Sequence, residues 1–303
     1  MRLLAVLAAC SLAGGCATIE SGIGGAETTA AEVLIPPSQE NALGLQVKND
    51  LEQNQHVKYL ADPAVNLYVT NVANKVIAFG RQARPEVTWQ VRVIDDPNTV
   101  NAFATPGGYL YVYSGLLLAA DNEAELAGVM AHETGHVVAR HAARNLVTAY
   151  GLQAVTSLAL GKNPNLGLQI AANLAQQGTL LAHSRADETE ADQYGVLYAS
   201  KAGYDPHGLV TFFQKLQSKE GNLPKVLSYL SDHPATADRI AHVNQLIAQK
   251  GLGGGNLNAA QFASIRARLG GSAASSSPTP TPSSSPAFAP QPASSGRHAP
   301  PPN

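Results

Sequence analysis

Apolar residues recur at helical spacing along most of the chain. Asp62 and Pro63 fit an N-cap followed by a first-turn proline, and Asn122 and Glu125 fit a capping box at the start of a longer helix. The spacing predicts helices over residues 39–60, 63–79, 121–146, 166–181, 205–216, 223–230 and 235–250. Helices therefore dominate the predicted fold.

Two stretches follow a pattern that is typical of strands. Val87, Trp89, Val91 and Val93 alternate with polar residues, which is the period of a half-buried strand. Residues 109–114 form a second β-rich run, directly after a Pro-Gly-Gly breaker. Both stretches precede the helix predicted at 121–146, so the pattern indicates the α+β class, mostly helical with a small β-sheet.

The two ends of the chain show neither pattern. Arg2 and the apolar residues 3–12 form a positive start and an apolar core, which is too short to span a bilayer but typical of an export signal. From Gly270 onward Ser, Pro, Ala and Thr dominate, which excludes a packed core and predicts disorder. The predicted organisation is a lipoprotein signal peptide at 1–15, a tether at 16–38, one globular domain at 39–269 and a disordered Pro/Ser-rich tail at 270–303.

Both cysteines, Cys10 and Cys16, lie in or just after the signal, so the mature chain has no cysteine pair for a disulfide. Residues 12–17 resemble a bacterial lipobox, although the leucine stands one position further from the cysteine than usual. Cys10 fits the short pattern better, but cleavage there would leave an apolar core below the usual ~7–15 residues. We therefore predict lipidation at Cys16; the alternative is a soluble exported protein with an incidental cysteine.

The residue after Cys16 also bears on location. It is alanine and not aspartate, which resembles the lipoproteins that are sent to the outer membrane. The predicted location is the periplasm of a Gram-negative bacterium, with a lipid anchor in the outer membrane.

Composition and charge narrow the function classes. With 303 residues, of which 45% are hydrophobic and 14% charged, the chain can bury a substantial core. The net charge of -2 and the absence of a Lys/Arg-rich tract argue against a nucleic-acid-binding surface. We therefore expect no nucleic-acid partner.

The candidate chemistry lies in His132-Glu133-Thr134-Gly135-His136, an HExxH motif. Two histidines four apart on a helix present their rings to one side, where a single divalent metal ion can bind both. Glu133 lies about 100° around the helix, where it can act as general base on a metal-bound water but is badly placed to be a ligand. Two buried imidazoles and a carboxylate are costly without an ion, which favours a metal site over a pair of core histidines.

Catalytic zinc usually takes three protein ligands and a water molecule, so the motif needs a third ligand. His141 follows His136 by five residues and would lie about 140° away on a continuing helix. The glycine turn that brings in a third histidine in other zinc peptidases is absent, since position 139 is alanine. This geometry predicts that His141 caps or packs and does not bind the metal.

The acidic run at 184–192 offers the other candidates. Glu188 and Asp192 share a helix face, so one could bind the metal and the other could hold the ring N–H of a ligand histidine. Glu190 points about 200° away from Glu188. Arg185 can pair with either carboxylate of the shared face. The alternative is a solvated acidic face with ion pairs along the helix.

These motifs resemble the HtpX, BepA and LoiP group of zinc peptidases, which is related to the CAAX prenyl-protein proteases. The likeness rests on four stretches: the HExxH motif, Arg185-x-x-Glu188-x-x-Ala191-Asp192, the Asn101-Ala102-Phe103-Ala104-x-Pro106-Gly107-Gly108 run, and His233-Pro234 with Arg239. The resemblance covers roughly residues 39–250. The membrane-embedded members of the group have several apolar spans, whereas this chain has none beyond its signal, so it resembles the exported lipoprotein branch. BepA-like members also have a C-terminal helical-repeat domain, and a Pro/Ser-rich tail replaces it here, which argues against a BepA-like scaffold role.

The resemblance implies a zincin-like domain with one Zn²⁺ per chain, held by His132, His136 and Glu188. It implies that Asp192 does not bind the metal itself but contacts one of the residues that do. It also places His233 and Arg239 near the metal, where either could stabilise the oxyanion, or His233 could occupy the fourth position in a latent form.

The predicted function is that of a zinc-dependent endopeptidase acting on unfolded or misassembled outer-membrane or periplasmic proteins. Residues 109–113 could hold the substrate backbone as a sheet edge; alternatively, their tyrosines only pack the sheet. The rival function is that of a non-proteolytic periplasmic chaperone or outer-membrane assembly factor that uses the same cleft. An intact Glu133 argues against this rival, since binding alone requires no base. A zinc hydrolase of non-peptide substrates is a more distant alternative.

Overall fold

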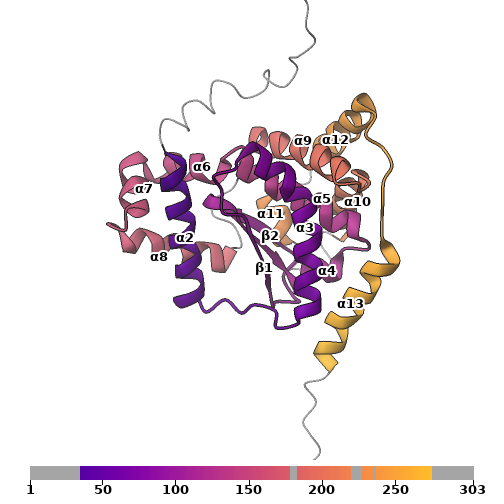
Figure 1. Cartoon of the computed structure of the whole chain (residues 1–303), viewed down its shortest axis with the longest axis horizontal. Helices are drawn as coiled ribbons and strands as arrows, with labels where there is room; N and C mark the ends of the chain where they lie inside the picture. Colours follow the sequence, from indigo (N-terminus) through magenta and orange to yellow (C-terminus); the bar gives the residue numbers. More distant parts are fainter. Residues whose placement is uncertain (1–34, 178–182, 220–226, 235–236, 275–303) are drawn as a thin grey trace, which may run out of the picture.

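The structure is a computed structural model that describes residues 35–177, 183–219, 227–234 and 237–274. It is mostly helical with one small sheet, which confirms the predicted α+β class (Figure 1). The elements in chain order are α2 (Pro37–Gln53), α3 (Pro63–Ala83), β1 (Gln90–Ile94), β2 (Ala102–Thr105), the 3₁₀ turn η1 (Pro106–Gly108), β3 (Tyr109–Tyr113), α4 (Ser114–Ala119), α5 (Glu123–Val138), α6 (His141–Tyr150), α7 (Leu152–Ala159), α8 (Pro164–Gln177), α9 (Arg185–Lys201), α10 (His207–Lys219), α11 (Leu227–Asp232), α12 (Ala237–Lys250) and α13 (Ala259–Ala274).

The sheet has the strand order β1-β3-β2, with β1 parallel and β2 antiparallel to the central strand β3. All five residues of β3 are buried. Residues 109–113 therefore cannot hold a substrate as a sheet edge, and that prediction is wrong, because β3 is paired on both sides. In the described part of the sheet, β1 and β2 are the two edge strands and β3 lies between them.

The sheet separates two apolar cores, because successive side chains of a strand point to opposite faces. Leu110 and Val112 join the core that α3, α5 and α10 complete. Tyr109, Tyr111 and Tyr113 join the other core, with α2, α6, α7 and α8. Figure 1 shows the same division, with α2 and the α6–α8 segment on one side of the strands and α3, α5, α9 and α10 on the other.

Two predicted boundaries near the sheet differ from the structure. The helix predicted to reach residue 60 ends at Gln53, because Leu60 N donates to Val93 O and Tyr59 forms a bridge with Ile94 at the edge of β1. The strand predicted from residue 87 begins at Gln90, after Trp89 with its positive φ of 43°.

The start of α5 follows its predicted capping. Asn122 Oδ1 accepts from Glu125 N at 3.0 Å, whereas the Glu125 carboxylate turns back to Asp121 N at 2.8 Å. The N-cap of α3 is also as predicted, since Asp62 Oδ1 accepts from Ala64 N and Val65 N.

The end of α5 contradicts the helix predicted over residues 121–146. The helix stops at Val138, and α6 begins at His141 after Arg140, whose φ of 60° and ψ of 29° are left-handed. The buried guanidinium of Arg140 donates from Nε to Glu40 Oε2 at 2.8 Å and from Nη2 to Ile35 O. We call residues 139–141 the elbow.

Helix α5 lies in the centre of the domain and is buried from Glu123 to Val137. It packs closely on α9, since a Cβ at Gly135 would lie 2.8 Å from Tyr194 Cβ and 3.0 Å from Ala191 O. Only glycine permits this approach. The close packing brings the inner face of α9 beside the HExxH motif.

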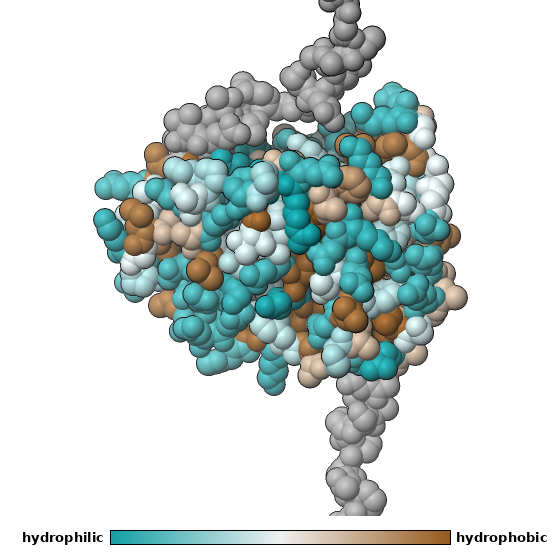
Figure 2. All heavy atoms as spheres, viewed as in Figure 1, coloured by the Kyte–Doolittle hydropathy of each residue, from teal (hydrophilic) through white to brown (hydrophobic). Residues whose placement is uncertain are grey.

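The remaining predictions concern the ends of the chain. Helix α13, which was not predicted, packs near α3 and α4 and continues to Ala274, past the predicted start of the tail at 270. The signal, Cys16 and most of the tether and tail lie outside the described residues. Across the described ranges, no helix combines the length and apolar character that crossing a bilayer requires. Figure 2 shows hydrophilic and hydrophobic residues interspersed over the face in view.

Candidate metal centre

Four side chains from three parts of the chain converge at the middle of α5. His132 and His136 face each other there, with their Nε2 atoms 3.0 Å apart. Glu188, from the first turns of α9, places Oε2 3.4 Å from His132 Nε2 and Oε1 3.5 Å from His136 Nε2. His233 follows α11, and its Nδ1 lies 2.9 Å from Glu188 Oε1 and 3.3 Å from His132 Nε2. All four residues are buried.

This arrangement fits a metal ion of the size of zinc. Donors at tetrahedral corners with Zn–N bonds of about 2.0–2.1 Å lie about 3.3 Å from one another, close to the distances among these four residues. Two imidazole nitrogens that face each other can share only one proton, and His132 Nε2 faces both His136 and His233. A cation at the centre would satisfy all of these lone pairs together.

Asp192 and Arg239 contact the four converging residues on the side that faces away from their centre. Asp192 Oδ1 lies 3.1 Å from His132 Nδ1, the ring nitrogen that faces away from the centre. Arg239 from α12 donates to both oxygens of Asp192, at 2.7 and 2.9 Å, and its Nη1 lies 2.7 Å from Glu188 Oε2. Arg185 was the partner predicted for these carboxylates, whereas in the structure their partner is Arg239. Arg185 is the exposed first residue of α9.

Electrostatics at the site favour a bound cation. Burial by itself would lower the pKa of His132, but the hydrogen bonds to Asp192 and Glu188 raise it to about 9. Burial would likewise raise the pKa of Glu188, whereas His233 and His132 hold it well below its ordinary value. Burial and the neighbouring rings of His183 and His132 hold the pKa of His136 well below its ordinary value, so this ring stays neutral. The carboxylates that stabilise a proton on His132 would equally stabilise a metal ion.

Glu133 lies next to the four converging residues without joining them. Its side chain is buried, and Oε1 lies 3.5 Å from His233 Nε2. Burial raises the pKa of Glu133, since desolvation disfavours the charged carboxylate. This position suits a group that exchanges a proton with a molecule at the centre.

Asn101 explains one of the sequence motifs. Its Nδ2 donates to Asp232 Oδ2 at 3.0 Å, and its backbone carbonyl accepts from Tyr113 N. Asp232 directly precedes His233, so Asn101 fastens the end of α11 to the sheet. The sequence predicted no specific contact for Asn101 and gave no sign of Asp232.

The structure also brings in two histidines that the sequence analysis excluded or did not consider. His141 Nδ1 lies 2.8 Å from His136 Nδ1, because the elbow turns α6 under the metal helix. The ring of His183 lies over that of His136, with centroids 4.0 Å apart. His183 stands five residues before Glu188, a spacing that no helical rule connects with the HExxH motif, so pattern reasoning had no signal for it.

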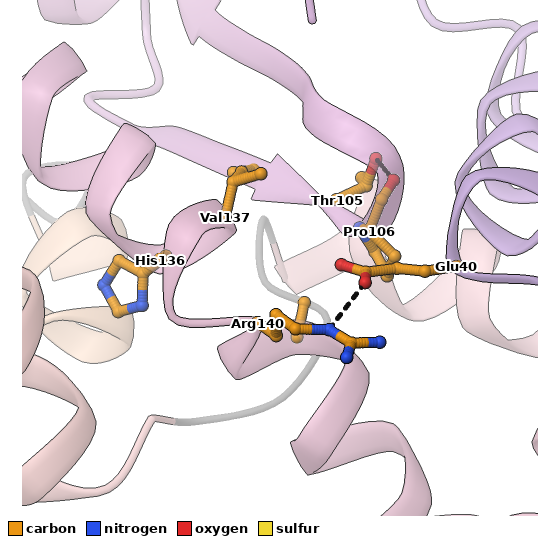
Figure 3. A pocket seen from close by; sticks show the side chains of 8 residues that line it. Glu40, Thr105, Pro106, His136, Val137 and Arg140 are labelled. Atoms are coloured by element: carbon orange, nitrogen blue, oxygen red, sulfur yellow. Dashed lines mark hydrogen bonds and ion pairs between the residues drawn. The ribbon is translucent and has the colours of Figure 1, made fainter. Parts of the chain in front are cut away.

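A small cavity adjoins His136 on the side of the elbow. Its volume of ≈ 10 Å³ is close to the smallest space that can hold one water molecule. Figure 3 shows His136 on one side of it, Thr105 and Pro106 on another, and the Glu40–Arg140 ion pair below them. The cavity therefore joins the end of β2, the elbow and one histidine of the motif.

The fold and the site together define the class of this protein. Metal-binding groups on a buried HExxH helix, beside a small sheet, are the arrangement of a metallopeptidase. The model of peptidase family M48 matches residues 63–247, and the chain belongs to this family.

Three relatives show the extent of the likeness. Metalloprotease LoiP of Escherichia coli (strain K12) is 30% identical over 260 residues, which are 83% of this chain and 100% of that protein. The beta-barrel assembly-enhancing protease of Yersinia pestis is 30% identical over 223 residues, 70% of this chain and 45% of that protein. Mitochondrial metalloendopeptidase OMA1 of Schizosaccharomyces pombe is 36% identical over 183 residues, 60% of this chain and 53% of that protein. The chain thus spans about half the length of the last two relatives, and the predicted BepA- and LoiP-like identity is confirmed.

Proposed function

We propose that the chain is a zinc-dependent endopeptidase that hydrolyses peptide bonds of unfolded or misassembled envelope proteins. The observation that carries this proposal is the convergence of His132, His136, Glu188 and His233 beside the buried carboxyl of Glu133. The names of two relatives support it, since one is a metalloprotease and the other a beta-barrel assembly-enhancing protease.

His132, His136 and Glu188 are the residues that would hold the zinc ion. Bound there, zinc would lower the pKa of a water molecule toward ~7 and polarise the scissile carbonyl. Asp192 and Arg239 fix the orientation of these residues through the contacts of Asp192 with His132 and of Arg239 with Glu188.

Glu133 is the proposed general base. Burial raises the pKa of its carboxyl, which makes it a stronger proton acceptor than an exposed glutamate. It takes a proton from the attacking water and later delivers that proton to the leaving amine. Burial keeps bulk water from competing for this proton.

His233 and Arg239 take different roles in this proposal. His233 Nδ1 lies among the metal-binding atoms, which favours the latent form in which His233 occupies the fourth position until substrate displaces it. Arg239 is engaged with Glu188 and Asp192, which favours an orienting role for it over contact with the oxyanion.

The substrate would bind as an extended segment along β2. Within the described ranges, β2 pairs only with β3, and β2 contacts the metal helix α5. Main-chain hydrogen bonds to such an edge bind many sequences, which suits unfolded polypeptides.

The proposed location is the periplasm, with a lipid anchor at Cys16 in the outer membrane. The signal architecture of residues 1–16 supports it. An unfolded outer-membrane protein is therefore the natural test substrate.

The test incubates zinc-loaded protein with an unfolded outer-membrane β-barrel protein and identifies the fragments by mass spectrometry. We expect cleavage by the wild type and a loss of about 10²–10⁴-fold in Glu133→Gln at unchanged zinc content. The same pair is made in a His233→Ala background, so that latency cannot hide activity. If all four proteins bind zinc and leave the substrate equally uncut, the chain is not a peptidase, and suppression of aggregation would then support the chaperone alternative.

A further inference from the structure

We propose that His141 is a positioning residue for the metal centre. Its Nδ1 accepts a hydrogen bond from His136 Nδ1–H and thereby leaves the lone pair of His136 Nε2 free for the metal. This inference rests on the proposed zinc site and adds a residue that the helical geometry of the sequence had set aside.

The proton positions follow from the distances. His136 Nε2 lies 3.0 Å from His132 Nε2 and 3.5 Å from Glu188 Oε1, so it is the nitrogen that faces the centre. When Nε2 binds a metal ion, the neutral ring carries its proton on Nδ1. His141 Nδ1 lies 2.8 Å from that atom and can accept this proton.

His141 must then carry its own proton on Nε2, and acceptors for it are present. Glu190 Oε2 lies 3.2 Å from His141 Nε2, and Asp187 Oδ1 lies 3.5 Å from it. Arg144 holds Asp187 in place through a hydrogen bond of 2.7 Å. Each N–H in this chain of contacts, from His136 through His141 to the two carboxylates, therefore meets an acceptor.

These contacts also explain the position of Glu190, which accepts from His141 Nε2. Glu190 points away from the converging side chains, as helical geometry predicts, and toward the far side of His141. The two histidines of the motif thus have different outer partners, since Asp192 contacts His132 directly and Glu190 reaches His136 through the ring of His141.

The elbow is what makes the contact with His141 possible. On a continuing helix, the side chain of residue 141 would lie about 140° around the axis from His136. The left-handed Arg140 redirects the chain, and the buried His141 is brought under His136. The ion pair between Arg140 and Glu40 of α2 holds this conformation.

The test compares two substitutions of His141. His141→Asn keeps an acceptor close to the position of Nδ1, whereas His141→Leu fills the space without one. We expect zinc binding, measured by competition with a chelator, to weaken about 10–100-fold in His141→Leu and to recover most of this loss in His141→Asn. His207→Leu, at the half-exposed first residue of α10, should leave zinc affinity unchanged.

Nuclear magnetic resonance gives a second readout that does not depend on activity. In ¹⁵N-labelled, zinc-loaded protein, the hydrogen-bonded Nδ1–H proton of His136 should give a slowly exchanging resonance in the wild type and in His141→Asn. This resonance should be lost in His141→Leu. Thermal unfolding of the metal-free variants checks that each one folds.

Three results would overturn the inference. His141→Leu could bind zinc as tightly as the wild type, His141→Asn could lose as much affinity as His141→Leu with both folded, or the His136 resonance could survive in His141→Leu. If the wild type binds zinc and cleaves substrate but any of these three results is found, the role proposed for His141 is wrong and the proposed function stands. A wild type that binds no zinc contradicts the proposed function itself.

Discussion

The two histidines of the HExxH motif lie one turn apart on the same helix, yet the protein holds them in different ways. The outer nitrogen of His132 meets the carboxylate of Asp192, which Arg239 grips with two hydrogen bonds. The outer nitrogen of His136 meets the ring of His141, which the left-handed Arg140 brings into place.

The difference separates two kinds of support. The His132 side is built from the regular helices α5, α9 and α12, so its geometry follows from helical spacing and helix packing. The His136 side depends on a break in a helix, which a residue of α2 stabilises from a distance. A single change in α2 should therefore disturb His136 and leave His132 largely in place.

The largest expected effect is at Glu188, which lies between the two sides. Glu188→Ala removes an oxygen donor and should weaken zinc binding by more than about 100-fold, beyond the 10–100-fold that changes of outer hydrogen-bond partners cost. Glu190→Ala should retain zinc, because the Glu190 carboxylate contacts His141 and Arg144 but none of the proposed ligands, and Asp187 remains beside the His141 ring. Metal content after dialysis against a chelator measures both variants; loss of zinc in Glu190→Ala together with its retention in Glu188→Ala would reverse the assignment.

The next effect tests the elbow. Glu40→Ala leaves the buried guanidinium groups of Arg84 and Arg140 without their shared carboxylate, and breaking a buried ion pair costs about 3–5 kcal/mol of unfolding free energy. Zinc affinity should fall as well, toward that of His141→Leu, because the elbow no longer holds His141 under His136. Chemical denaturation and chelator competition measure the two effects.

Glu52→Ala is the matched control on the same helix. Glu52 pairs with Lys48 and accepts from the Tyr59 hydroxyl on the partly exposed side of α2, so the change should cost about 1–2 kcal/mol, less than Glu40→Ala, and leave zinc affinity unaltered. If Glu40→Ala lost stability but kept full zinc affinity, the elbow would be a structural feature without influence on His136.

What could be predicted from the sequence follows the same division. The fold class and the shared face of Glu188 and Asp192 depend on spacing within single elements, and the structure shows both. The elbow could not be predicted, because glycine and asparagine are the usual residues of the left-handed conformation and position 140 is arginine. What holds Arg140 there is Glu40, which lies 100 residues away in the sequence.

The same reasoning explains the incorrect partner of Glu188. Helical spacing placed Arg185 within reach, since residues three apart are neighbours on a helix surface. It could not show that the face bearing Glu188 is buried against α5, or that Arg239, 47 residues after Asp192, enters this space from α12. Contacts between helices that are distant in the sequence were visible only through the family resemblance, which placed Arg239 near the metal without naming its partners.

The smallest expected effect tests this corrected pairing. Arg185→Ala should change the unfolding free energy by no more than about 0.5 kcal/mol and leave zinc affinity intact, because the side chain is exposed at the first residue of α9. Arg239→Ala is its counterpart and should weaken zinc binding, since Asp192 and Glu188 then lose the guanidinium that orients them. Both are measured by chelator competition on variants that unfold cooperatively. Loss of zinc in Arg185→Ala would show that this arginine reaches the carboxylates after all. The support of His132 would then come from residue spacing within α9 and not from the packing of α12.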